Sequence, residues 1–331
     1  MSGPATRRKT RVVALCGGVG GAKLALGLSH VVAPQALTLI VNTGDDFEHL
    51  GLHISPDIDT VLYTLAGLND RERGWGRADE TWNFMAALGA LGGESWFQLG
   101  DRDLATHIER TRRLSSGQSL SAVTAELACE MGIEARILPM TDAPLRTIVD
   151  TSEGMLPFQR YLVERRCEPA VTAVRFEGAN TAHAAPGVLD ALSDPELAAI
   201  IICPSNPYLS IDPILAVSDI RRALEGAAAP VVAVSPIIGG KAVKGPASKI
   251  MRELGIEPDT RAIAAHYAGI IDGMVIDMSD RDDAQNLDMP VLTTPTLMRS
   301  LDDRTRLAQD TWNFAMALAG RAQRTVKSAV A

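Results

Sequence analysis

A glycine-rich segment near the start of the chain has the composition of a phosphate-binding turn. The sequence LCGGVGGAKLALGL (15–28) follows an apolar run that we expect to form a strand ending at Leu15, and a helical pattern resumes from about Ala22. The N-terminus of such a helix directs backbone N–H groups and a positive dipole end at an anion, and glycines let the backbone come close to it. The residues expected to hold the anion are Gly17, Gly18, Gly20, Gly21 and Lys23.

This segment follows neither of the two common phosphate-binding patterns. A dinucleotide fingerprint needs a third glycine where Lys23 stands, and a P-loop needs glycine, lysine and serine or threonine in succession. Here Ala22 precedes Lys23 and Leu24 follows it. We therefore predict a phosphate site of another type; the alternative is a tight turn that only packs the helix on the strand.

Acidic side chains gather after the second apolar run. The segment NTGDD contributes Asn42, Thr43, Asp45 and Asp46, and the following HISPDIDT contributes His53, Asp57 and Asp59. Carboxylates shared with substrate phosphates suit Mg²⁺, and a carboxylate can also accept the proton of an attacking hydroxyl. We predict Mg²⁺ ligands among Asp45, Asp46, Asp57 and Asp59. The alternative for Asp59 is a capping role at the start of a helix.

Three later segments carry further polar candidates. Arg102 in LGDRDLATHIER could clamp a phosphate or carboxylate, or pair with the acids beside it. Ser205 and Asn206 end the run in CPSNP, and Pro236 and Lys241 lie in VSPIIGGKAVKGP. Each segment read singly could be only a turn. Because each follows an expected strand, we predict that they share one crevice at the carboxyl edge of a sheet.

The elements that position these residues follow a strand–helix rhythm. Apolar runs bounded by turn residues occur at 11–18, 36–46, 134–142, 170–178, 197–207, 229–240 and 273–280. Several are continuous, as in strands buried on both faces, and helical patterns separate many of them. We predict an α/β fold with a Rossmann-like, mostly parallel sheet flanked by helices. The core would span 11–60 and 134–325, with a small helical subdomain at 61–133 and a disordered start at 1–10.

Composition excludes several classes of partner. The net charge is -8 and aromatic residues make up 4% of the chain, which argues against nucleic acid and anionic membranes. No apolar run reaches the ~20 residues of a membrane span. Residues 1–11 are polar and basic, so we expect no signal peptide. Four isolated cysteines without a CxxC pair fit a reducing cytoplasm.

Seven segments together resemble one protein family. In order, they are GGVGGAKLALGL, VNTGDD, ISPDIDTVLYTLAGL, GDRDLATHIERT, ILPMTD, CPSNPYLSI and SPIIGGKAVKGPA. This set is similar to the 2-phospho-L-lactate transferases, in particular to the mycobacterial-type phosphoenolpyruvate transferases of coenzyme F420 biosynthesis. The resemblance runs from about residue 11 to about residue 320.

The resemblance implies a reaction and its participants. The ribityl hydroxyl of the deazaflavin Fo attacks the distal phosphorus of a GMP-activated phosphoenolpyruvate or 2-phospholactate, GMP leaves, and dehydro-F420-0 or F420-0 forms. It also implies Mg²⁺ dependence and a homodimer. The glycines and Lys23 would then hold the diphosphate, Asp45 or Asp59 would be the base, and Arg102 would contact Fo or the acidic group of the donor. Ser205 and Asn206 would face the guanine, and Asn42, Thr43, His53, Pro236 and Lys241 complete the predicted substrate-binding set.

Two other functions remain open on the sequence. One is a non-catalytic regulator that binds nucleotide sugars, from a related family of cell-shape and gluconeogenesis factors; it would not need the acidic cluster. The other is an NAD-dependent dehydrogenase, which rests on fold analogy and lacks the third glycine.

Overall fold

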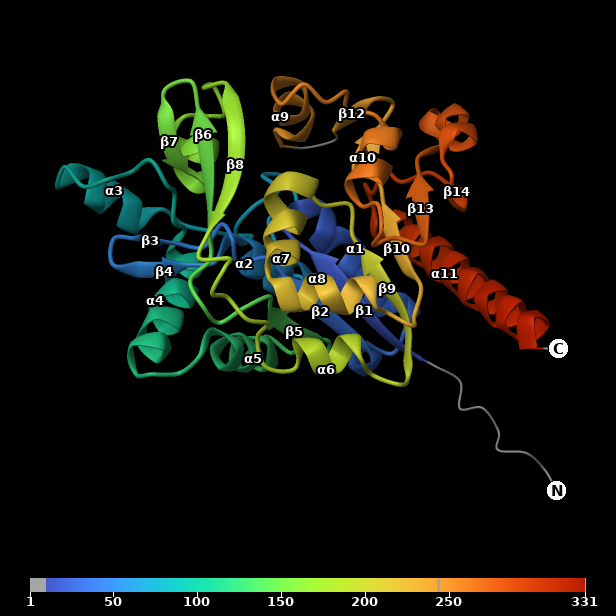
Figure 1. The fold of residues 1–331 in the computed structure, drawn as a ribbon. Helices are drawn as coiled ribbons and strands as arrows, with labels where there is room; N and C mark the ends of the chain where they lie inside the picture. Colours follow the sequence, from blue (N-terminus) through green and yellow to red (C-terminus); the bar gives the residue numbers. More distant parts are fainter. Residues whose placement is uncertain (1–9, 243–244, 331) are drawn as a thin grey trace.

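A seven-stranded parallel sheet forms the centre of the protein (Figure 1). The structure is a computed structural model and describes residues 10–242 and 245–330. The order across the sheet is β14-β13-β10-β9-β1-β2-β5. The strands are β1 (Arg11–Cys16), β2 (Leu37–Val41), β5 (Arg136–Pro139), β9 (Leu197–Ile202), β10 (Val231–Val234), β13 (Gly273–Ile276) and β14 (Val291–Thr293).

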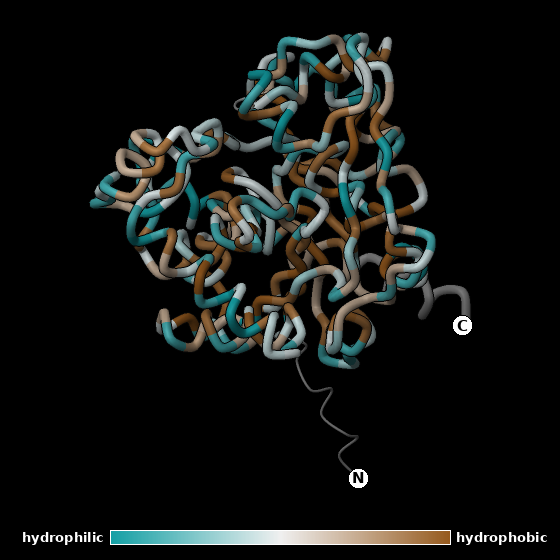
Figure 2. The backbone as a smooth tube through the Cα atoms, turned by 90° about the vertical axis from the view of Figure 1, so that its left-hand side faces the viewer, coloured by the Kyte–Doolittle hydropathy of each residue, from teal (hydrophilic) through white to brown (hydrophobic). Residues whose placement is uncertain are grey.

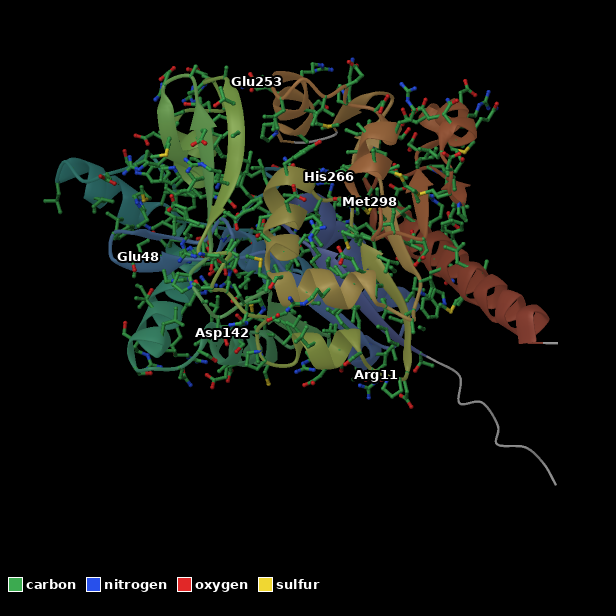
Figure 3. All side chains as sticks on the ribbon, viewed as in Figure 1. Arg11, Glu48, Asp142, Glu253, His266 and Met298 are labelled. Atoms are coloured by element: carbon green, nitrogen blue, oxygen red, sulfur yellow. The ribbon has the colours of Figure 1, made fainter. Side chains whose placement is uncertain are left out.

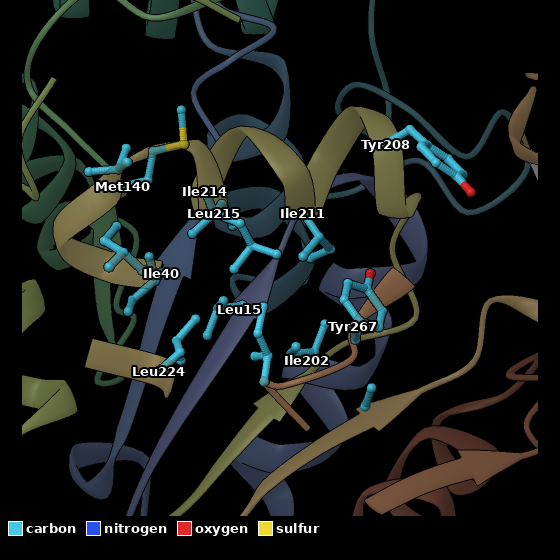
Figure 4. Close-up of a cluster of buried hydrophobic side chains, with 14 of the residues drawn as sticks. Leu15, Ile40, Met140, Ile202, Tyr208, Ile211, Ile214, Leu215, Leu224 and Tyr267 are labelled. Atoms are coloured by element: carbon cyan, nitrogen blue, oxygen red, sulfur yellow. The ribbon is translucent and has the colours of Figure 1, made fainter. Parts of the chain in front are cut away.

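Helices cover both faces of this sheet, which confirms the predicted α/β class. On one face, α1 (Gly18–Val31), α2 (Pro56–Leu65), α5 (Leu120–Glu130) and α11 (Leu301–Val330) pack against Val12, Ala14 and their neighbours. On the other face, α7 (Asp212–Ala216) and α8 (Ser218–Glu225) pack against Leu15, Ile40 and Ile202 (Figure 4). The expected continuous apolar runs arise because alternate strand residues enter two different cores.

The segment 61–133 is mainly helical. It contains α3 (Asn83–Ala90), α4 (Asp101–Ser115) and α5. The predicted boundary at residue 61 falls inside α2. Ile54, Met85 and Leu99 form a small separate core under α3 and the hairpin of β3 (Phe47–His49) and β4 (Leu52–Ile54). In Figure 1, α3 lies far from the central sheet. The division into a core and a subdomain itself stays a prediction.

The strand expected at 170–178 is not part of the central sheet. It forms β8 (Val171–Glu177) of a three-stranded antiparallel sheet with β6 (Arg146–Thr151) and β7 (Gly154–Pro157), in the order β7-β6-β8. Residues along β6 alternate between buried and half-buried, so this sheet has one inner face and one outer face. Figure 2 shows the hydrophobic stretches running mostly through the middle of the molecule.

Smaller elements complete the chain. They are α6 (Val188–Leu192), α9 (Ala247–Glu253), α10 (Thr260–His266) and the hairpin of β11 (Ile237–Ile238) and β12 (Lys241–Ala242). None of the helices in the described ranges is long and apolar enough to cross a membrane. The segment expected to be disordered, 1–10, lies outside the described residues except for Thr10.

Candidate active site

A cavity of about 630 Å³ opens at the carboxyl edge of the central sheet. It lies where the chain leaves β1, β9 and β10, and strand order reverses around β1, which is the usual place for a ligand in an open α/β sheet. The predicted residues that line it are Gly17, Gly18, Gly20, Lys23, Asp45, Asp57, Asp59, Ser205, Asn206 and Pro236.

The glycine-rich segment is the first turn of a helix rather than a loop before one. We expected the helix from about Ala22, but α1 begins at Gly18, directly after the extended Gly17. A Cβ on Gly17 would meet the side chains of Asp57 and Ser210, and one on Gly20 would meet the carbonyl oxygen of Pro204. These glycines therefore allow neighbouring segments to approach closely, and the helix N-terminus still faces the cavity.

The carboxylate of Asp57 occupies the N-terminus of α1. Its Oδ1 accepts a hydrogen bond from the Gly18 N–H at 2.6 Å, and its Oδ2 accepts one from Asn42 Nδ2 at 2.9 Å. Across the turn, Ser205 Oγ accepts the Gly17 N–H at 3.1 Å. The turn thus holds an anionic oxygen with backbone N–H and amide donors, which is the chemistry expected of a phosphate site.

Asn42 brings a second carboxylate close to the first. The same Nδ2 donates to Asp45 Oδ1 at 3.3 Å, and Gln159 Nε2 donates to Asp45 Oδ2 at 3.2 Å. Asp45 and Asp57 are both buried, and neither makes an ion pair with any side chain of the described residues. The site therefore contains two buried acids whose negative charge the described part of the chain does not neutralise by contact.

Burial and mutual repulsion shift these acids toward their protonated forms. Burial raises the pKa of Asp57 to about 6, against hydrogen bonds from Asn42 and Gly18 that lower it. Burial also raises the pKa of Asp45 well above its usual range, and the nearby carboxylates of Asp57 and Asp46 raise it further. Crowded acids with raised pKa values are typical of functional sites.

Asp59 has a different environment because the chain supplies its counter-charge. Arg110 is fully buried and binds Asp59 in a bidentate manner: Nη1 donates to Asp59 Oδ2 at 3.1 Å and Nη2 donates to Oδ1. His107 Nδ1 lies 3.7 Å from the same Oδ2. Burial raises the pKa of Asp59, while Arg110 and His107 oppose that shift.

A buried polar network extends from this pair along α2 and α4. The Tyr63 hydroxyl donates to Asp103 Oδ1 at 2.6 Å, and His107 Nε2 lies 3.3 Å from Asp103 Oδ2. Asp103, His107 and Arg110 share one face of α4, since they are spaced by about one helical turn. Asp59, Tyr63, Asp103 and His107 line the cavity, whereas Arg110 lies behind them.

The start of α4 is capped by a side chain from the preceding loop. Glu80 accepts the backbone N–H groups of Arg102 and Asp103 at 2.7 and 2.8 Å. In return, Asp101 accepts the Thr81 hydroxyl at 2.6 Å and the Phe84 N–H at 3.0 Å at the start of α3. These hydrogen bonds lower the pKa of Asp101 to about 2.

The remaining predicted residues lie outside the cavity lining. Asp46 is buried and accepts Ser55 Oγ at 2.8 Å, while His53 Nε2 lies 3.1 Å from the same oxygen. Arg102 contacts Glu80 through its backbone, as described, and Lys241 is exposed on β12. The other predicted residues that do not line the cavity are Gly21, Asn42 and Thr43, and all three are buried. Roles for all of these residues at a substrate stay predictions.

The cavity has two chemically different sides. The side formed by α2, the loops around α3 and the β7 region presents Trp75, Phe97, Phe158, Leu162 and Val163, which we name the aromatic wall. The side formed by the loops after β9, β10 and β14, which we name the loop wall, presents the hydroxyl groups of Ser205, Ser235 and Thr296 beside aliphatic residues such as Ile238, Leu297 and Met298, and it has no aromatic ring among the described lining residues.

Lys23 lies beside the loop wall. Its Nζ donates to the carbonyl oxygen of Met298 at 3.1 Å, and both residues line the cavity; Figure 3 labels Met298 in the central part of the molecule.

The buried carboxylates supply only part of the ligands that a Mg²⁺ ion needs. No three His, Cys, Asp or Glu side chains in residues 10–242 and 245–330 are arranged as a complete ligand set. Mg²⁺ needs only one or two protein carboxylates when substrate phosphates and water supply the rest. Within the described ranges, Asp45 and Asp57 make no ion pair, and Asp46 Oδ1 is buried without a hydrogen-bond partner. This donor set fits a cation that arrives with a phosphate ligand.

Sequence reasoning missed several residues of the site. Tyr63, Trp75, Phe97, Arg110 and Gln159 come from segments where the sequence indicated only helix or loop. The spacing of His107 and Arg110, three residues apart on an expected helix, was the available signal for Arg110.

Comparison with known proteins identifies the family of the chain. The family model described as 2-phospho-L-lactate transferase CofD matches residues 12–295. A phosphoenolpyruvate transferase of Streptomyces coelicolor is 41% identical over 314 residues, covering 92% of this chain and 98% of that protein. A 2-phospho-L-lactate transferase of Methanosarcina mazei is 40% identical over 301 residues, covering 90% and 98%.

The fold is also found in a solved structure of lower sequence similarity. A UPF0052 family protein from Bacillus halodurans superimposes with a TM-score of 0.61 at 15% identity, covering 92% of this chain and 99% of that one. This likeness concerns the fold. The family match and the two relatives confirm the resemblance noted in the sequence, and the chain belongs to the CofD family of 2-phospho-L-lactate transferases.

Proposed function

We propose that this transferase moves a phosphoenolpyruvyl or 2-phospholactyl group from its GMP-activated donor to the ribityl hydroxyl of the deazaflavin Fo. The products are GMP and dehydro-F420-0 or F420-0. The observation that carries the proposal is the cavity of this family member, in which buried acids without ion-pair partners adjoin both a helix N-terminus and an aromatic wall. We also expect a homodimer in the cytoplasm.

The donor's diphosphate fits the turn at the start of α1. Because the Gly18 N–H already binds the Asp57 carboxylate, the diphosphate would lie beside it, near Gly20 and Lys23, which line the same cavity. A diphosphate at this position would place its guanosine toward the loop wall, where Ser205, Ser235 and Thr296 offer hydroxyl groups. Guanine needs such polar partners along its edges.

Asp45 is the better candidate for the base. Both oxygens of Asp59 are held by Arg110, whereas Asp45 receives only amide hydrogen bonds from Asn42 and Gln159. Burial and neighbouring acids raise the pKa of Asp45, which makes its carboxylate a stronger proton acceptor than an ordinary aspartate.

The reaction can be written with this residue in its role. The ribityl oxygen forms a bond to the distal phosphorus, the bond from that phosphorus to the bridging oxygen breaks, and GMP leaves with the electron pair. The proton of the hydroxyl passes to Asp45. Asn42 holds the carboxylates of Asp45 and Asp57 in one buried cluster beside the start of α1, so the chain contributes mainly positioning. Mg²⁺, which Asp45, Asp57 and Asp46 would hold, supplies positive charge against the diphosphate.

The proposal is tested by turnover with product identification. Purified protein, Mg²⁺ and Fo are mixed with each donor, and mass spectrometry follows GMP and the Fo phosphodiester. We expect both products with at least one donor, and the faster donor shows whether the transferred group is phosphoenolpyruvyl or 2-phospholactyl. Asp45→Asn should lose activity, while Glu48→Gln, an exposed acid of β3 labelled in Figure 3, should retain it. Nucleotide binding without turnover from either donor would instead favour the regulator function.

A further inference from the structure

Trp75 is a large aromatic residue that is partly exposed at the cavity. It is 47% exposed although it lines the cavity, in a chain whose large apolar side chains are mostly buried. Glycines flank it on both sides, Gly74 with φ of 78° and Gly76 with φ of 69°, in the left-handed region that favours glycine. This backbone conformation holds the indole out from the loop and against the cavity.

The loop that carries Trp75 is fixed at its base. The Gly74 N–H donates to the Asp70 carbonyl oxygen at 3.0 Å, and the Asp70 N–H donates to the Gly76 carbonyl oxygen at 3.1 Å. The carboxylate of Asp70 also accepts the backbone N–H of Arg73 at 2.9 Å. The position of Trp75 therefore follows from a hydrogen-bonded turn.

Aromatic contacts orient the rings of this region. Trp75 meets Trp82 edge to face, with ring centres 6.2 Å apart, and the Arg73 guanidinium lies 4.7 Å from the Trp82 ring. Phe97 of the aromatic wall is held edge-on by Phe47 at 4.9 Å. These contacts order the rings in advance, so little side-chain entropy would be lost when a flat ligand binds.

We propose that Trp75 is the residue that selects the acceptor, by stacking on a flat polycyclic ring held against the aromatic wall. The inference rests on the proposed function and assigns its acceptor side. Phe97, Phe158, Leu162 and Val163 offer an apolar surface, which suits a fused ring system with few polar edges. The guanine of the donor is the other flat ring in the reaction, and its polar edges are better matched by the hydroxyl groups and Asn206 of the loop wall.

The test measures binding of each ring separately, without turnover. The proteins are the wild type, Trp75→Ala, Trp75→Phe and the control Trp312→Phe, whose tryptophan lies on α11 and is not among the cavity-lining residues. Fluorescence titration reports Fo affinity, and calorimetry with GDP reports the donor side. Loss of a base-stacking aromatic weakens binding by roughly 5- to 150-fold, so we expect that loss of Fo affinity in Trp75→Ala.

The variants also separate stacking from loss of fold. Trp75→Phe should retain most of the Fo affinity, because it keeps an aromatic face. GDP affinity should match the wild type in all variants, which shows that the cavity is intact. Two results would overturn the inference but not the proposed function. One is equal Fo affinity in Trp75→Ala and the wild type. The other is a Trp75→Ala variant that loses GDP affinity and keeps Fo affinity. Absence of Fo binding and turnover in the wild type would overturn both.

Discussion

Replacement of Asp57 by asparagine should remove a loss of stability that grows with pH, while it impairs the site. Asp57 is 6% exposed and lies against the start of α1, with only neutral donors around its carboxylate. Burial raises its pKa from 3.8 to about 6, so the folded protein resists ionisation of this group. Asparagine has nearly the same shape and carries no charge.

The size of the effect follows from the pKa shift. One pKa unit corresponds to about 1.4 kcal/mol, so an ionised Asp57 destabilises the fold by about 3 kcal/mol. Between pH 3.8 and about 6 the folded state keeps this proton while the unfolded state loses it. The free energy of unfolding therefore falls as pH rises through this window. Above about pH 6, Asp57 causes no further change in the free energy of unfolding. About 2 kcal/mol of the change develops between pH 4.5 and 7.5.

Urea unfolding at several pH values measures this effect. Wild type and Asp57→Asn are compared from pH 4.5 to 7.5 in EDTA and phosphate-free buffer. The stability of the variant relative to the wild type should increase with pH by about 2 kcal/mol. Part of the change can come from Asp45, because Asp57 raises the pKa of Asp45 and its removal relieves that repulsion. Both contributions have the same sign.

Asp101 provides a matched control of opposite sign. Its hydrogen bonds with Thr81, Phe84 and Asn83 lower its pKa to about 2, so its stabilising effect is complete above the usual aspartate range. Asp101→Asn should be less stable than the wild type by an amount that does not vary from pH 4.5 to 7.5. A pH-independent difference for Asp57→Asn, or one that shrinks as pH rises, would refute the reasoning about Asp57.

Three other changes test separate parts of the site. Asp45→Asn should lower kcat by roughly 10²- to 10⁴-fold with little change in stability at pH 5, as measured by turnover and urea unfolding; equal activity would exclude it as the base. Arg110→Met should cost about 3–5 kcal/mol because it leaves the buried Asp59 without its arginine partner, and adding Asp59→Asn should recover part of that loss in the same unfolding assay. Gly20→Ala should cost about 1–3 kcal/mol because its Cβ would meet the Pro204 carbonyl oxygen, and an unchanged midpoint would contradict that close approach.

The sequence predicted the part of the site that follows directly from strand ends. Gly17, Asn42 and Ser205 each come just after a parallel strand, and parallel strands end at one edge, so their proximity follows from the strand assignment alone. Asp57 reaches the same edge because α2 begins immediately after the β3–β4 hairpin.

Contacts between helices could not be predicted in the same way. Arg110 meets Asp59 only because α4 packs beside α2, and nothing in the spacing of either helix identifies the partner. Trp75 was missed since a tryptophan between two glycines is also typical of an ordinary loop. The separate sheet of the strand at 170–178 was not predicted, because apolar content does not show which strand it pairs with.

The two acids of the first turn of α2 show how the site divides charge between protein and ligand. Asp57 and Asp59 are two residues apart, and both are buried where the helix dipole favours negative charge. Asp59 receives a counter-charge from Arg110 of the same chain, whereas Asp57 receives only amide donors. An acid that the chain has already neutralised is poorly suited to attract a cation, and an acid left without a partner is destabilising until one binds. The uncompensated pair of Asp45 and Asp57 is therefore where Mg²⁺ should increase the stability of the protein most, and Asp57→Asn should reduce that increase.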